Sequence, residues 1–116
     1  AAAPLCRGER VTPFEILASP ILRRPVKQLA ILTHIGEMED RTDRGQDSRP
    51  ETTTLRIRER LGIPHGSMYS SLYPLIDAGL VRKGELVRVR YRYTAPCHEL
   101  TPEGRRWYET IRRWRA

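Results

Sequence analysis

The sequence predicts a single α+β domain that is mainly α-helical, and three observations support this class. Apolar residues repeat with a helical period in the segments 26–39, 51–61, 65–79 and 102–115. Between the last two of these segments the period changes to two, which indicates a pair of β-strands. A chain of 116 residues with 39% hydrophobic and 30% charged residues is long enough for one modest core and too short for a two-domain enzyme with a cofactor cleft.

The domain is expected to begin at Thr12. Residues 1–11 show no periodicity and predict a flexible N-terminal arm, so the domain is placed at residues 12–116. The run Thr12-Pro13-Phe14-Glu15 is typical of a helix start, because threonine can cap, proline suits the first turn and glutamate can bond back to the cap. Ser19-Pro20 is expected to end that short helix.

Two further helices are expected before the middle of the chain. A stripe of apolar residues predicts a core helix after Pro25; its members are Val26, Leu29, Leu32 and Ile35, with Ile31 beside them. Residues 39–50 are the most polar stretch and predict an exposed loop. A helix over 51–61 should follow and end at Gly62.

The segment 65–79 predicts a helix with two different faces. Met68, Leu72, Leu75 and Ile76 form one apolar stripe. The opposite positions hold Ser67, Tyr69, Ser70, Ser71 and Tyr73, which are small or capable of hydrogen bonding. Pro74 removes a backbone donor inside this helix and is expected to bend it.

The segment 80–94 predicts a β-hairpin. Its strands are placed at Leu80–Lys83 and Val87–Thr94, joined around Gly84-Glu85. In the second strand Arg88, Arg90 and Arg92 should face one way, opposite the valines and tyrosines that alternate with them. Residues 95–99 look like an insertion, after which a last helix over about 102–115 carries Trp107, Ile111 and Trp114 on one stripe.

Positive charge is concentrated in the second half of the chain. The formal net charge is +7, and 19 of the 21 basic residues are arginines. Residues 1–60 hold 11 basic and nine acidic side chains, whereas residues 61–116 hold 10 and five. This surplus favours a polyanionic partner, for which the planar guanidinium group is well suited. GC-rich coding or a merely solvated basic surface would give the same composition.

The order of these elements is that of a winged helix-turn-helix domain, with a two-stranded β wing and a C-terminal helix. The second helix of the pair has to enter a DNA major groove, so its outward face needs small and polar side chains. The hairpin beside it reaches phosphates or the minor groove, so it needs cationic groups. The recognition helix is therefore placed at about 65–79 and the wing at about 80–94.

The run GSMYSSLYPLIDAGLV over residues 66–81 resembles the recognition-helix signature of PadR-like winged-helix regulators, within the broader MarR-like group. The matching positions are Gly66, Ser67, Met68, Tyr69, Leu72, Leu75, Gly79 and Leu80. RVRYRYT and ELTPEGRRWYE further on resemble the wing strand and the following helix of the family. The resemblance implies a dimeric transcriptional repressor. No positions match the family's phenolic-ligand site, so a small-molecule effector is left open.

The predicted function is sequence-specific binding of double-stranded DNA by a homodimer. The residues expected to contact DNA are His65, Ser67, Tyr69, Ser70, Tyr73, Arg82, Lys83, Arg88, Arg90 and Arg92. Core packing for the two tyrosines, and simple solvation for the wing arginines, are the competing interpretations. Trp107, Ile111 and Trp114 are assigned to a dimer interface, with packing against their own domain as the alternative.

Two other roles are compatible with this fold. One is a DNA-binding protein of a plasmid or phage partition, replication or excision system. The other is a winged helix that binds proteins through its aromatic stripe. A catalytic role is not expected, because no nucleophile–base arrangement or nucleotide-binding motif is present.

No cofactor, metal or disulfide framework is expected. Cys6 and Cys97 are interpreted as reduced thiols, and Cys97-His98 is half of a metal site at most, since His34 and His65 lack a matching spacing. No long apolar run or leader is present, so no membrane association is expected. The expected location is the cytoplasm, in association with the nucleoid.

Overall fold

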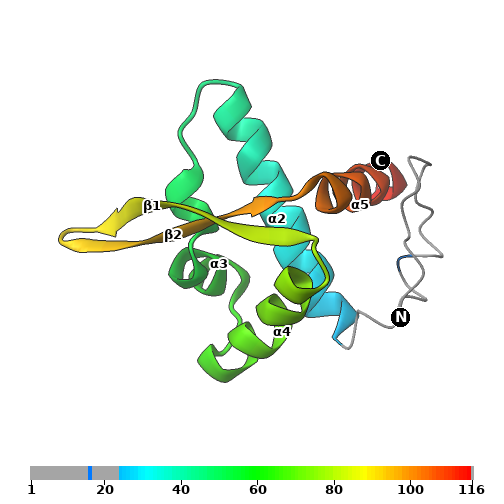
Figure 1. The fold of residues 1–116 in the computed structure, drawn as a ribbon, viewed down its shortest axis with the longest axis horizontal. Coiled ribbons are helices and arrows are strands. Elements are labelled where there is room, and N and C mark those ends of the chain that lie inside the picture. Colours follow the sequence, from blue (N-terminus) through cyan, green and yellow to red (C-terminus); the bar gives the residue numbers. More distant parts are fainter. Residues whose placement is uncertain (1–15, 17–23, 116) are drawn as a thin grey trace.

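The longest helix, α2 (Pro25–Asp43), runs through the middle of the molecule (Figure 1). The structure is a computed structural model that describes Ile16 and residues 24–115. Ile31, Leu32 and Ile35 are fully buried, as the apolar stripe predicts, whereas Val26 is 83% exposed and does not belong to the core. The predicted arm 1–11 and the helix from Thr12 lie outside the described residues, apart from Ile16, which is fully buried.

The described part of the chain has an α+β fold that is mostly helical, which confirms the predicted class at this level (Figure 1). A two-stranded antiparallel sheet is its only sheet. After α2 come the 3-10 helix η1 (Arg49–Thr52), α3 (Thr54–Leu61), α4 (His65–Asp77), β1 (Val81–Arg90), β2 (Tyr93–Leu100) and α5 (Pro102–Arg115). The core is made by apolar side chains of all four α-helices and both strands.

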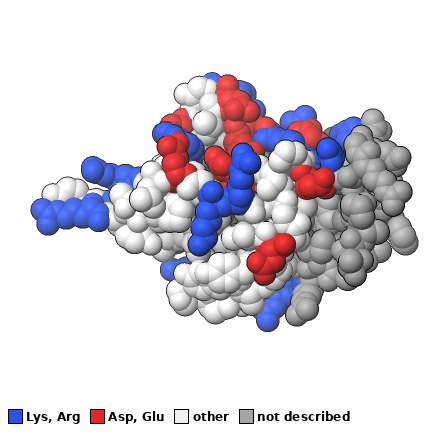
Figure 2. All heavy atoms as spheres, in the orientation of Figure 1, with Lys and Arg blue, Asp and Glu red and all other residues white. Residues whose placement is uncertain are grey.

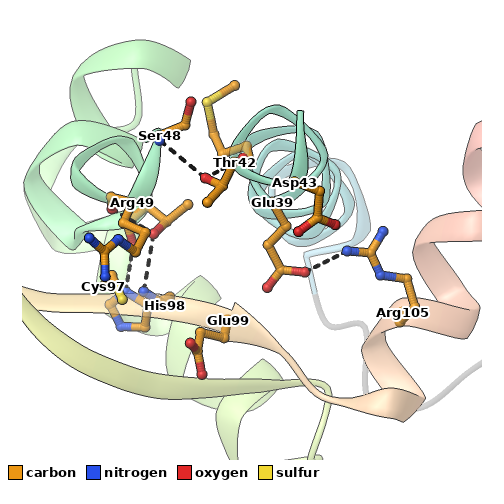
Figure 3. Close-up of a pocket in the computed structure, with 11 residues that line it drawn as sticks. Glu39, Thr42, Asp43, Ser48, Arg49, Cys97, His98, Glu99 and Arg105 are labelled. Carbon is orange, nitrogen blue, oxygen red and sulfur yellow. Dashed lines mark hydrogen bonds and ion pairs between the residues drawn. The ribbon is translucent and has the colours of Figure 1, made fainter. Parts of the chain in front are cut away.

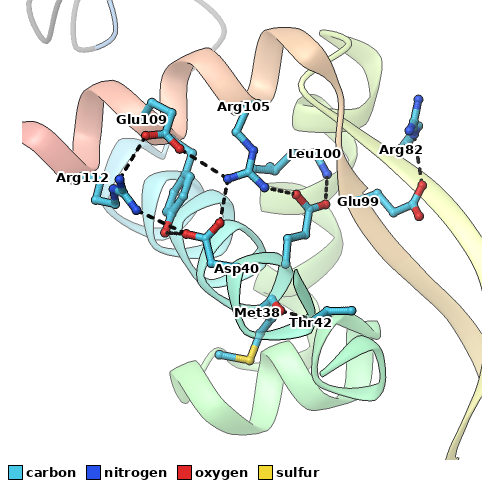
Figure 4. Close-up of polar contacts among 11 residues, drawn as sticks. Met38, Asp40, Thr42, Arg82, Glu99, Leu100, Arg105, Glu109 and Arg112 are labelled. Carbon is cyan, nitrogen blue, oxygen red and sulfur yellow. Dashed lines mark hydrogen bonds and ion pairs between the residues drawn. The ribbon is translucent and has the colours of Figure 1, made fainter. Parts of the chain in front are cut away.

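The loop predicted for residues 39–50 is wrong for its first five residues, because α2 continues to Asp43. The reason is Arg105 of α5, which lies 2.7 Å from Glu39 Oε1 and 3.0 Å from Asp40 Oδ1; Figure 4 shows Asp40 pointing toward Arg105. Glu39 also accepts a hydrogen bond of 2.8 Å from the backbone N–H of Leu100. These contacts stabilise the C-terminal turns of α2. Their partners lie more than 60 residues further along the chain, so the local sequence does not reveal them.

Helices α3 and α4 are joined by a tight three-residue turn. Gly62 adopts a left-handed conformation with φ of +67°, and the N–H of Ile63 donates to the carbonyl of Arg58 over 3.1 Å. This arrangement ends α3 as the sequence predicts. The following residue, Pro64, precedes the first turn of α4.

Helix α4 buries the predicted stripe. Met68, Leu72 and Leu75 are at most 1% exposed. Ser71, expected on the outward face, is fully buried, and its carbonyl accepts a hydrogen bond of 3.4 Å from Gln28 of α2. Pro74 lies inside the helix without ending it before Asp77.

The hairpin differs from its prediction in length and in the place of its turn. Strand β1 runs unbroken from Val81 to Arg90, so Gly84-Glu85 is not the turn, and the chain reverses at Tyr91-Arg92. Lys83 pairs with His98 and Leu86 with Pro96, which leaves Gly84 and Glu85 in a bulge opposite Cys97. The segment 95–99, predicted as an insertion, is the second half of β2.

The base of the hairpin is attached to the body through η1. Thr53 forms an isolated β-bridge with Cys97. The backbone N–H of His98 donates to Thr52 Oγ1 over 3.3 Å, and the ring Nδ1 of His98 lies 2.8 Å from the carbonyl oxygen of Thr52. Both Cys97 and His98 are buried, so the strand emerges from the core before it projects outward.

Helix α5 has the predicted bounds but packs on its own domain. Trp107 is fully buried and Ile111 is 6% exposed, and both belong to the core. The assignment of these two residues to a dimer interface is therefore wrong, because the side chains of their own domain cover them. Trp114, at 54% exposure, is the one member of the predicted stripe that is accessible.

Candidate nucleic-acid interface

A row of three aromatic rings covers the exposed face of α4. His65, Tyr69 and Tyr73 are spaced four residues apart, so they lie on one side of the helix. The rings of His65 and Tyr69 meet edge to face at 5.5 Å, and those of Tyr69 and Tyr73 lie 5.3 Å apart at an interplanar angle of 32°. Tyr69 is 39% exposed and Tyr73 is 46% exposed, so neither is a core aromatic.

The rest of this face carries hydroxyl groups, and its one acidic residue is the exposed Asp77 at the end of the helix. Ser67 is half-buried, and Ser70 is exposed. The hydroxyl of Ser70 lies 3.4 Å from the carbonyl of Gly66 and 3.2 Å from that of Ser67, so its proton is used within the helix. The structure thus places the five predicted α4 residues on the accessible side of the helix, which carries no charge before Asp77.

The predicted basic residues of the hairpin fall into two groups. Arg82 forms an ion pair with Glu99 on the neighbouring strand at 3.1 Å, and Arg90 forms one with Glu59 of α3. Lys83, Arg88 and Arg92 are exposed and make no ion pair with any described residue. Among the predicted basic residues of the hairpin, these three are therefore the ones whose charge no neighbouring carboxylate neutralises.

The arginines do not form the single row that the alternation predicts. Arg88 pairs with Thr94 and Arg90 with Tyr93, so Val89 is an extra residue in β1. Arg92 lies in the turn, in the left-handed region at φ of +63°, with its guanidinium 5.2 Å from the centre of the Tyr91 ring. The bulge and the turn therefore interrupt the strict alternation on which the single row depends.

Helix α3 adds basic residues that the sequence pattern does not single out as DNA contacts. Arg56 Nη2 donates to the carbonyl of Val89 over 3.2 Å, which ties α3 to the hairpin. Arg58 and Arg60 make no ion pair within the described part of the chain, and Arg60 is exposed. The sequence feature that could have singled out these two arginines is their position about one helical turn before α4.

Several acidic groups gather at the C-terminal half of α2, away from the start of α4 (Figure 2). The bond between Gln28 and Ser71 places α4 against the N-terminal half of α2. The carboxylates of Glu39 and Asp40 lie on the C-terminal half, about 18 Å further along the helix axis at its normal rise per residue. Figure 2 shows red side chains over that end of α2 and blue ones at the tip of the hairpin.

A cavity of about 230 Å³ lies between α2, η1 and β2 (Figure 3). Its lining includes Glu39, Asp43, Cys97, His98 and Arg105. Burial raises the pKa of Glu39 and of the Cys97 thiol and lowers the pKa of His98. The cavity thus lies at the base of the hairpin, beside the attachment of β2 to η1.

Within the described residues no group of histidine, cysteine and carboxylate side chains has the arrangement of a metal site. Among the same residues no helix combines the length and the apolar character needed to cross a membrane. Comparison with protein-family models, with curated protein sequences and with solved structures finds no match.

Proposed function

We propose that this chain binds double-stranded DNA sequence-specifically as a winged helix-turn-helix protein. In this proposal α4 enters the major groove, and the hairpin of β1 and β2 lies against the adjacent backbone. The observation that carries the proposal is the pairing of a basic hairpin with an exposed helix face that is uncharged before Asp77. The face carries no carboxylate before Asp77, which limits repulsion from phosphates, and guanidinium groups beside it supply the attraction.

The distribution of charge supports the same orientation. Lys83, Arg88 and Arg92 of the hairpin are exposed and free of ion pairs within the described chain. The acidic end of α2 lies on the other side from α4 (Figure 2). An approaching duplex would therefore meet positive potential at α4 and the hairpin first.

We further propose that the protein acts as a homodimeric transcriptional repressor of the PadR-like type. Of the predicted interface residues only Trp114 is exposed, so the dimer contact is narrowed to the end of α5. Two-fold symmetry would require a roughly palindromic operator with half-sites about one helical turn, ~34 Å, apart.

Selection of bound duplexes from a random pool tests this proposal. It should yield a palindrome, and affinity for it should fall about 10³-fold or more between low and moderate salt. The double variant Arg88→Ala/Arg92→Ala should bind more weakly and lower the salt slope by about 1 to 2, since each phosphate that is no longer neutralised lowers it by ~0.9. Arg41→Ala/Arg44→Ala is the matched control, since it removes equal charge from two exposed residues at the acidic end of α2.

The possible results separate the candidate roles. Equal weakening of binding in both double variants would overturn the assignment of the hairpin to the DNA backbone, because only net charge would then matter. An array of repeats in place of one palindrome would favour partition or replication over repression. Absence of salt-dependent DNA binding would overturn the proposal and leave a protein-interaction module.

A further inference from the structure

We propose that α4 recognises the 5-methyl groups of thymine in the major groove, through the rings of Tyr69 and Tyr73. This inference rests on the proposed function and names the chemical feature of DNA that the helix selects. It follows from which side chains the exposed face of α4 presents and from those it lacks.

Apart from its last residue, Asp77, the helix lacks every side chain that makes paired hydrogen bonds to a base edge. From His65 to Ile76 it contains no Arg, Lys, Asn, Gln, Asp or Glu. Guanine is normally recognised by Arg or Lys, adenine by Asn or Gln, and cytosine by Glu or Asp. Recognition by the residues before Asp77 must therefore use apolar contacts or single hydrogen bonds from hydroxyl groups and the exposed His65 ring.

The hydroxyl contacts are limited. The proton of Ser70 is donated to backbone carbonyls of its own helix at 3.2 and 3.4 Å, and Ser67 is half-buried. The largest accessible groups are the phenol rings of Tyr69 and Tyr73, at 39% and 46% exposure. In the major groove the apolar feature that a ring can contact is the thymine methyl group.

The spacing of the rings suits neighbouring thymines. The two ring centres lie 5.3 Å apart. Successive bases of a strand rise by about 3.4 Å, so the separation corresponds to roughly one and a half base steps. The contact of each ring with its neighbour at 32° also limits rotation of the side chains before DNA arrives. We therefore expect two thymines within three consecutive positions of each half-site.

Deoxyuridine substitution tests the inference on the selected duplex. Replacing one thymine at a time by deoxyuridine removes the methyl group and keeps the base pair and the O4 acceptor. At the contacted positions the dissociation constant should rise about fourfold for each methyl group removed, the equilibrium equivalent of burying one such group. Substitution outside the half-sites should leave it unchanged.

Variants of the tyrosines assign the effect to the rings. Tyr69→Phe and Tyr73→Phe keep the ring and should keep the fourfold discrimination. Tyr69→Ala and Tyr73→Ala should each abolish it at one thymine position, and both residues are exposed enough for the fold to tolerate the change. Tyr91→Ala is the control: this residue is 81% exposed in the hairpin turn, and a contact outside the major groove cannot detect the methyl group.

Each outcome decides one question. Specific binding that is indifferent to deoxyuridine at every position would overturn the inference and leave the proposed function intact. Discrimination that survives in both alanine variants would overturn the assignment to Tyr69 and Tyr73. Failure to bind any duplex specifically would overturn the proposed function, and this inference with it.

Discussion

The carboxylate of Asp40 on α2 accepts a hydrogen bond of 2.8 Å from the phenol of Tyr108 on α5 (Figure 4). Arg105 lies 3.0 Å from the same carboxylate and Arg112 lies 3.6 Å from it. Burial raises the pKa of Asp40, but the hydrogen bonds from Tyr108 and Arg105 outweigh burial and leave that pKa below its usual range. One acidic residue thus anchors the last helix.

Tyr108→Phe should lower the free energy of unfolding by about 1–2 kcal/mol, because it removes one hydrogen bond to a charged, part-buried acceptor. The depressed pKa of Asp40 contributes stability that is present above its unfolded pKa and lost as pH falls. The variant should therefore lose less stability than the parent on acidification. Urea unfolding at several pH values measures both effects, with the exposed Tyr91→Phe as control. Identical acid profiles would contradict the role given to the phenol.

Gly36→Ala should destabilise the protein although alanine favours helices. A Cβ atom at this position would lie 2.4 to 2.7 Å from ring carbons of Tyr108, which is itself buried and cannot retreat easily. Overpacking of this kind costs about 1–3 kcal/mol. Gly66→Ala on α4 is the matched control, because nothing lies within 4 Å of its Cβ position. Equal melting temperatures for the two variants would show that α5 does not sit tightly on α2.

Stability should fall through His98 as the pH drops below about 6.5, the ordinary pKa of a histidine side chain. Burial lowers the pKa of His98, and nearby Lys83 lowers it further. As the pH falls, the His98 side chain therefore binds a proton in the unfolded chain before it does so in the folded chain. Stability is lost as the pH drops below the unfolded pKa. His98→Asn should flatten this dependence. Glu39, whose pKa burial raises, acts with the opposite sign, so the difference between parent and variant is the quantity to measure. An unchanged profile in His98→Asn would refute the assignment.

Arg92→Gly should raise the free energy of unfolding by up to ~1 kcal/mol, because an L-residue in the left-handed region is strained and glycine is not. Arg92 has φ of +63° in the turn of the hairpin. The same variant should bind DNA more weakly under the proposed function. Arg92→Lys retains both the strain and the charge and serves as control. Thermal melts together with binding measurements test the pair of effects, and a loss of stability on glycine substitution would count against the strain.

The elements with a strong local period could be predicted from the sequence. The stripe of Met68, Leu72 and Leu75 identifies the buried side of α4, and Trp107 with Ile111 marks α5 correctly. The same period could not tell whether α5 covers its own domain or a second subunit. That depends on the fit between Tyr108 and the bare backbone at Gly36, which lies in another helix.

The hairpin could not be placed correctly because glycine has more than one use. The sequence favours a turn at Gly84, but a Cβ atom there would lie 2.7 Å from Cys97 Sγ, so this glycine permits close packing across a bulge. The turn instead falls on Tyr91-Arg92, a pair without a turn signature. The charges of Glu39 and Asp40 led to a wrong prediction for a similar reason. In the sequence they indicate a solvent-exposed loop, whereas the fold brings Arg105 of α5 to them.

The attachment of β2 to η1 has a consequence for any partner that touches both α4 and the hairpin. Thr52 and Thr53 hold His98 and Cys97 immediately before the chain enters α3, and Arg56 holds Val89 further out. The helix pair and the hairpin therefore form one preorganised unit whose spacing is set on folding. A partner that matches this spacing costs the protein little conformational entropy on binding, and one that does not match can engage only one of the two elements.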